Sequence, residues 1–156
     1  MEEDLSFENL RQVFDMPDID LKTYSPLSLA FLGDAVYEII VRSIVTGTGN
    51  NHPNRLHNMS AHIVKAQSQR MMVEALEPSF TDEEKDILRR GRNAKSYTHA
   101  KNASVADYRM ATGFETLLGY LFIKGDNDRI LTLIRKGFDD TGLLDIRPSD
   151  REETNK

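Results

Sequence analysis

The chain has 156 residues, no cysteine and a formal net charge of −5 at pH 7. This length suits one domain that buries its own core, and the missing cysteines exclude disulfides, thiolate metal sites and cysteine nucleophiles. Residues 2–4 are acidic where an export signal would be basic, and charges interrupt the longest apolar stretch, 27–45. We therefore expect a cytoplasmic protein with no membrane span.

The charges are unevenly distributed along the chain. Residues 1–38 carry two basic and nine acidic side chains, whereas residues 39–106 carry ten basic and six acidic ones. Within that middle part, the intervals 39–73 and 87–106 contain no Asp or Glu. The overall charge argues against a nucleic-acid partner, but this distribution predicts a localised anion-binding surface.

Helical signals dominate the first half of the chain. The apolar spacing at 5–14 allows a short helix. A serine followed by proline is typical of a helix start, and predicts a helix over 25–45. The glycine- and asparagine-rich segment 47–53 predicts a loop, and a second helix is expected over about 58–76.

The second half is also predicted to be helical. Thr81 and Glu84 have the capping-box spacing for a short helix that ends at Gly91. A further helix is expected over 104–124 and a last one over 129–138. Because no strand pattern of useful length is present, we predict an all-α fold.

Two carboxylates stand on helices that are otherwise apolar. Asp34 lies in the middle of the helix 25–45, and Glu115 lies among aromatic and leucine side chains of the helix 104–124. An ionised carboxylate in such surroundings costs several kcal/mol unless a cation or hydrogen bonds compensate it. If the helices pack side by side, the pair could hold Mg²⁺, which prefers oxygen ligands and can activate water.

A purely structural interpretation of these acids is equally compatible with the residues alone. In that interpretation Asp34 pairs with Arg42 or Arg109, and Glu115 points to solvent. Glu38 lies one turn after Asp34 on the same face and either joins the site or reaches water. We favour water for Glu38.

Other conspicuous residues are assigned no chemistry. His57 and His62 are five apart, do not share a helical face well and are poor metal co-ligands. Met71 and Met72 are expected in the core or a dimer interface. Two glycines within the helix 104–124 are expected to permit close packing, within the protomer or across a dimer: Gly113 and Gly119.

Three segments carry a family resemblance, in the right order. Residues 29–38 (LAFLGDAVYE), 90–96 (RGRNAKS) and 112–121 (TGFETLLGYL) resemble the signature helix, the basic loop and the second carboxylate helix of the ribonuclease III catalytic domain. The resemblance spans roughly residues 25–138. It divides the chain into three expected parts: an N-terminal extension at 1–24, a catalytic domain at 25–142 and a polar tail at 143–156.

Two positions depart from the family pattern. Ala30 and Thr112 stand where ribonuclease III has a glutamate and an aspartate, so half of its four carboxylates are absent. We also expect no double-stranded-RNA-binding domain to follow. Together with the segments 52–57 (HPNRLH) and 63–69 (IVKAQSQ), these departures identify the chain as a member of the Mini-ribonuclease III family.

The resemblance implies a function and a set of roles. It implies a homodimer that trims double-stranded stems of ribosomal RNA precursors, 23S rRNA in particular, with a ribosomal protein able to assist. Asp34 and Glu115 would bind the catalytic Mg²⁺, and cleavage would leave 5′-phosphate and 3′-hydroxyl ends. The candidate phosphate contacts are Arg90, Arg92, Asn93, Lys95 and Ser96, with Lys65 and Lys101 as second choices.

Simpler functions remain open beside the nuclease. The basic residues could form a solvated loop and helix face only. The fold could serve as a non-catalytic RNA-binding module, or as a helical interaction protein with no RNA. Retention of Asp34 and Glu115 in apolar helices favours the enzyme, because a decayed site would relieve their desolvation cost.

Overall fold

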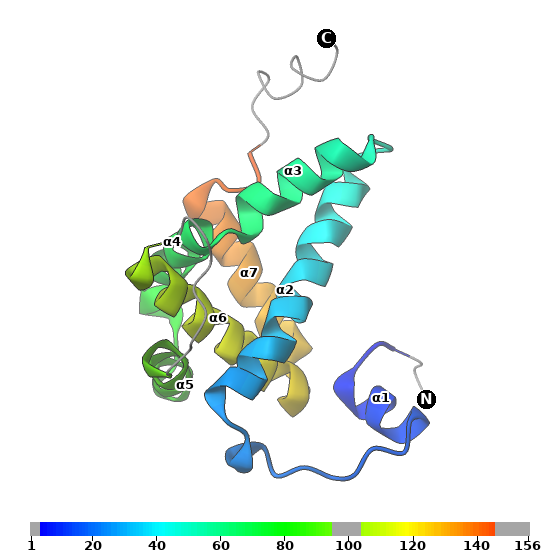
Figure 1. Ribbon diagram of the computed structural model, residues 1–156, viewed down its shortest axis with the longest axis vertical. Coiled ribbons are helices and arrows are strands. Elements are labelled where there is room, and N and C mark those ends of the chain that lie inside the picture. The colour runs from blue at the N-terminus through cyan, green and yellow to red at the C-terminus, as the bar shows by residue number, and fades with distance from the viewer. Residues whose placement is uncertain (1–3, 95–103, 146–156) are drawn as a thin grey trace.

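The computed structural model describes residues 4–94 and 104–145, and these residues form helices and no strand (Figure 1). The all-α prediction is therefore confirmed for the described part of the chain. None of the described helices is long and apolar enough to cross a membrane. The elements in chain order are α1 (Phe7–Val13), η1 (Leu21–Thr23), α2 (Pro26–Gly47), α3 (Pro53–Val64), α4 (Ala66–Leu76), η2 (Glu77–Ser79), α5 (Asp82–Asn93), α6 (Val105–Lys124) and α7 (Asn127–Thr141).

The helix α6 lies at the centre of the fold. It packs most extensively against α2, and it also contacts α4, α5 and α7. Phe114, Leu117 and Leu118 on α6 are fully buried. Because α6 has neighbours on several sides, its apolar residues surround the helix and do not form the single stripe of a surface helix.

The helix starts follow the capping signals of the sequence. Ser25 accepts a hydrogen bond from the main-chain N–H three residues later, at 3.2 Å. Thr81 and Glu84 exchange both hydrogen bonds of a capping box, at 2.9 and 3.1 Å. The Ser104 side chain caps α6 in the same way as that of Ser25, at 3.0 Å. Such caps satisfy N–H groups that have no partner within the helix.

One expected helix is two helices. Residues 58–76 were predicted as a single helix, but α3 ends at Val64 and α4 begins at Ala66, because Lys65 is extended, with ψ 153°. The freed carbonyl groups find new donors at the break. Ser68 Oγ donates to the His62 carbonyl oxygen at 2.7 Å, and Gln69 Nε2 donates to that of Val64 at 2.9 Å.

Glycine has a different role at Gly91 from the one its position predicted. The helix α5 continues to Asn93, and Gly91 is buried against Thr116 of α6. An added methyl group at Gly91 would collide with the Thr116 side chain, so glycine is needed there for packing. Gly113 and Gly119 likewise allow close packing within the protomer, on α5 and α2 respectively. The last helix also differs from its prediction, since α7 covers 127–141.

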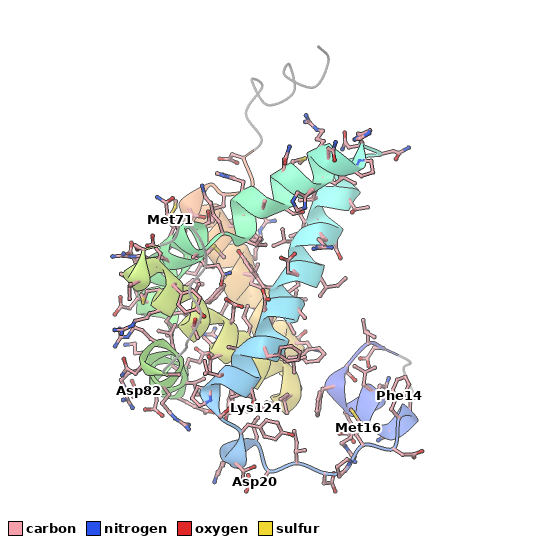
Figure 2. All side chains as sticks on the ribbon, in the orientation of Figure 1. Phe14, Met16, Asp20, Met71, Asp82 and Lys124 are labelled. Atoms are coloured by element: carbon pink, nitrogen blue, oxygen red, sulfur yellow. The ribbon has the colours of Figure 1, made fainter. Side chains whose placement is uncertain are left out.

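The N-terminal helix α1 lies to one side of the helical body (Figure 1). Its Phe7 ring meets Phe122 of α6 edge-on, with 6.3 Å between centroids. Phe14 follows the helix and is 68% exposed (Figure 2). The two methionines on α4 also differ in burial, because Met72 is in the core whereas Met71 is 40% exposed at the surface (Figure 2).

Candidate active site

The candidate site lies where α2 and α6 cross. The main chains of the two helices approach closely because glycine faces glycine there. A methyl group at Gly33 would collide with the carbonyl oxygen of Glu115, and one at Gly119 would collide with the carbonyl oxygen of Leu29. Asp34 directly follows Gly33, so the crossing itself brings Asp34 close to Glu115.

The side chains of Asp34 and Glu115 lie within hydrogen-bonding reach of each other. Burial is the largest cause that raises the pKa of Glu115 from 4.5 to about 8, and the charge and hydrogen bond of Asp34 and the charge of Glu38 contribute to the same rise. Without a cation, Glu115 therefore keeps its proton at neutral pH. A divalent cation between the two groups would replace that proton and remove the cost of burying the charge.

The two acids are not equally buried. The sequence predicted both in apolar surroundings, but Asp34 is exposed on α2 whereas Glu115 is largely covered. The prediction of a buried Asp34 was therefore wrong. Because Asp34 is exposed, solvent or a ligand can reach the pair from its side.

The structural alternative for these acids is not what the fold shows. Arg42 pairs with Glu38 at 3.0 Å and not with Asp34, and Arg109 lines a separate pocket beside Arg70. Among the described residues, no three His, Cys, Asp or Glu side chains are grouped closely enough to hold a metal ion. The site therefore offers two carboxylates, and further ligands for a cation must come from water or substrate.

Gln69 of α4 belongs to the site, although it was not predicted from the sequence. Its side chain is buried, its amide interacts with the Glu115 carboxyl, and that contact lowers the pKa of Glu115. Its Oε1 has no hydrogen-bond partner among the described residues. A signal was present, because Gln69 shares the helical spacing of the core residues Met72, Val73 and Leu76.

The two positions at which this chain lacks the carboxylates of the family are buried. Ala30 is buried in α2. Thr112 is also buried, and its hydroxyl donates to the carbonyl oxygen of Tyr108 in its own helix, at 3.0 Å. Neither position presents a free oxygen to the pair.

The basic candidates are only partly described. Arg90, Arg92 and Asn93 are exposed, but they form the last turn of α5 and not the loop that was predicted. Lys65 is exposed at the break between α3 and α4. Three candidates lie outside the described residues: Lys95, Ser96 and Lys101. The two histidines of α3 that were assigned no chemistry are both exposed: His57 and His62.

Residues 27–126, which include both acids of the site, match the Ribonuclease III domain. The chain belongs to the ribonuclease III domain family. Membership makes it an endoribonuclease of the ribonuclease III type, a family that acts on double-stranded RNA.

Individual proteins that resemble this chain agree with its membership in the ribonuclease III family. The chain is 45% identical over 117 residues to the Mini-ribonuclease 3 of Enterococcus faecalis, covering 74% of this chain and 89% of the relative. It is 43% identical over 121 residues to that of Staphylococcus aureus, covering 76% and 90%. A crystal structure of a protein from Fusobacterium nucleatum superposes with a TM-score of 0.69 at 29% identity, covering 76% of this chain and 96% of that one.

Proposed function

We propose that this chain is a Mg²⁺-dependent endoribonuclease that hydrolyses double-stranded RNA, with Asp34 and Glu115 as the residues that hold the ion. The pairing of an exposed and a buried carboxyl group across the α2–α6 crossing carries the proposal. Such a pair is unfavourable when both groups are ionised and becomes favourable with a cation between them.

The donor set fits a hard divalent cation. The two carboxyl groups are oxygen donors of the kind that Mg²⁺ prefers. A bound Mg²⁺ supplies water activation and charge stabilisation at a phosphate. Asp34 and Glu115 supply the negative charge that binds it, Gln69 orients Glu115, and Gly33 and Gly119 set the separation of the helices.

The proposed substrate is a double-stranded stem of the 23S ribosomal RNA precursor, cut in the cytoplasm to leave 5′-phosphate ends. The resemblance to the Mini-ribonuclease III family supports this choice, and a large-subunit ribosomal protein that presents the stem belongs to the same proposal. A-form RNA displays phosphates and 2′-hydroxyls across a shallow minor groove. Four exposed residues of the described chain suit contacts to them: Lys65, Arg90, Arg92 and Asn93.

We further propose that the enzyme is a homodimer joined through the face of α2 that carries Phe31. Phe31 is 85% exposed, three residues before Asp34. It borders an apolar groove of about 480 Å³, which Leu27, Tyr24 and Ile123 also line. A symmetric pair that buries these faces would cover an aromatic side chain that is costly to expose. It would also place two sites near one axis, one for each RNA strand.

One incubation separates the enzyme from its alternatives. The full chain is mixed with duplex RNA, with Mg²⁺ in one sample and a chelator in the other, and cleavage and binding are both measured. Cleavage that requires Mg²⁺ supports the proposal. Binding without cleavage in either sample would assign the chain to a non-catalytic RNA-binding module. If it neither cleaved nor bound, it would be an interaction protein.

A further inference from the structure

A pocket that contains three arginines lies between α4, α5 and α6, and neither Asp34 nor Glu115 lines it. Its volume is about 270 Å³. Since a water molecule occupies about 30 Å³ in the liquid, there is room for a phosphate group with some of its hydration. Its lining residues are Arg70, Arg92, Asn93, Ala106, Arg109 and Met110.

The arginines of this pocket differ in how their charges are balanced. Arg70 is paired with Asp107 at 3.2 Å and with Glu74 at 2.9 Å, which fixes it between α4 and α6. Arg92 and Arg109 are exposed, and no carboxylate within residues 4–94 and 104–145 forms an ion pair with either. The pocket therefore carries a positive surplus even when Asp107 and Glu74 are counted.

The chemistry of the lining selects an oxyanion. The guanidinium groups of Arg92 and Arg109, which have no ion pair among the described residues, present several N–H donors, and the Asn93 amide adds another donor. Guanidinium groups match the paired oxygens of a phosphate better than a single point charge does. Four of the six lining residues carry charged or amide side chains, and the other two are Ala106 and Met110.

We propose that this pocket binds one phosphodiester group of the RNA backbone, held by Arg92 and Arg109. The inference rests on the proposed function, and it adds Arg109 as an RNA-binding residue. The carboxylate pair and the pocket are neighbours, because consecutive residues of α4 contact them: Gln69 interacts with Glu115, and Arg70 lines the pocket. Along α6, Arg109 precedes Glu115 by six residues, a rise of about 9 Å. A phosphate held there fixes the register of the duplex on the carboxylate pair.

The test is duplex RNA binding by the full chain in the presence of a chelator, measured at several salt concentrations. Arg109→Ala is expected to weaken binding at least about fivefold, and to reduce the slope of log K against log salt by about one. Arg109→Lys is expected to recover part of the affinity. The matched control is Arg135→Ala, since Arg135 is an exposed arginine of α7 already paired with Asp139. Its binding should stay within about twofold of the parent.

The outcomes separate this inference from the proposed function. If the parent fails to bind duplex RNA, the proposed function itself is overturned. If the parent binds and Arg109→Ala keeps both its affinity and its salt slope, the pocket is not a phosphate site. Circular dichroism shows whether each variant is folded. A titration of the parent with inorganic phosphate, followed by the arginine Nε–H resonances, reports anion binding in the pocket directly. An Arg109 resonance that phosphate does not shift would also contradict the assignment.

Discussion

Gly33 contacts the main chain of Glu115 where α2 and α6 cross, so closely that a methyl group at Gly33 would collide with the carbonyl oxygen of Glu115. The same contact determines how far Asp34, the next residue, lies from the Glu115 side chain. The geometry of the carboxylate pair is thus a product of helix packing. Changes in that packing should affect stability and metal binding together.

Gly33→Ala should lower the free energy of unfolding by about 1–3 kcal/mol, because the added methyl forces two closely packed helices apart. Chemical denaturation measures this loss, and Mg²⁺ binding should weaken in the same variant. The control is Gly47→Ala at the end of the same helix, where an added methyl meets no atom within 4 Å. It should change stability little or raise it, by up to about 1 kcal/mol. Equal losses in both variants would contradict a specific role for the crossing.

Glu115 should make the metal-free protein less stable as the pH rises. Its pKa is about 8 in the folded chain and 4.5 as an ordinary glutamate, so between these values the folded chain keeps a proton that the unfolded chain has released. The contribution of this proton to the free energy of unfolding is therefore fully present below about pH 4.5 and is lost as the pH rises through about 8. Glu115→Gln imitates the protonated acid and should remove this loss.

Denaturation at about pH 5 and about pH 8.5 measures the effect. The parent and Glu115→Gln should be similarly stable at the lower pH, and the variant should be more stable at the higher one by at least about 1 kcal/mol. Mg²⁺ should restore the parent at the higher pH and leave the variant unchanged, because the cation replaces the proton. Parallel pH profiles for the two proteins would rule out a raised pKa at Glu115.

Gln69→Leu should weaken Mg²⁺ binding about tenfold or more, the usual effect of losing a group that orients a metal ligand. It should also cost about 1–2 kcal/mol of stability, because the Val64 carbonyl loses its donor. Calorimetric titration with Mg²⁺ measures the first effect. Gln67→Leu, on the exposed side of the same helix, is the control. Unchanged Mg²⁺ affinity in Gln69→Leu would remove Gln69 from the site.

Phe31→Asp should convert the proposed dimer into a monomer, because a carboxylate would replace the aromatic side chain at the centre of the interface. Light scattering coupled to size-exclusion chromatography reports the mass. Leu131→Asp is the control, since Leu131 is 55% exposed on α7, outside the groove. A parent that is already monomeric at all concentrations tested, or a Phe31→Asp variant that remains a dimer, would overturn this interface.

Features that depend on local sequence could be predicted. The caps at Ser25, Thr81 and Ser104 involve residues only a few positions apart, and their signals gave the correct starts of three helices. The residues alone left the encounter of Asp34 with Glu115 as one of two alternatives, and the family resemblance favoured it.

Features that depend on tertiary contacts could not be predicted in this way. No glycine or proline marks the break at Lys65, which instead relies on hydrogen bonds from Ser68 and Gln69. Gly91 was assigned to a helix end on local grounds, whereas its contact with Thr116 of α6 explains it. The pocket around Arg109 needs three helices to be in place before it exists.

The roles of Asp34 and Glu115 as holders of the catalytic Mg²⁺ are tested most directly by the rate of duplex RNA cleavage in Mg²⁺. The variants Asp34→Asn and Glu115→Gln are measured for cleavage and for duplex binding, beside Asp139→Asn as a surface control on α7. We predict that both site variants lose at least about a hundredfold in rate, or about 2.7 kcal/mol. They should still bind the duplex within about threefold of the parent. Cleavage at the parent rate by either site variant would contradict these roles.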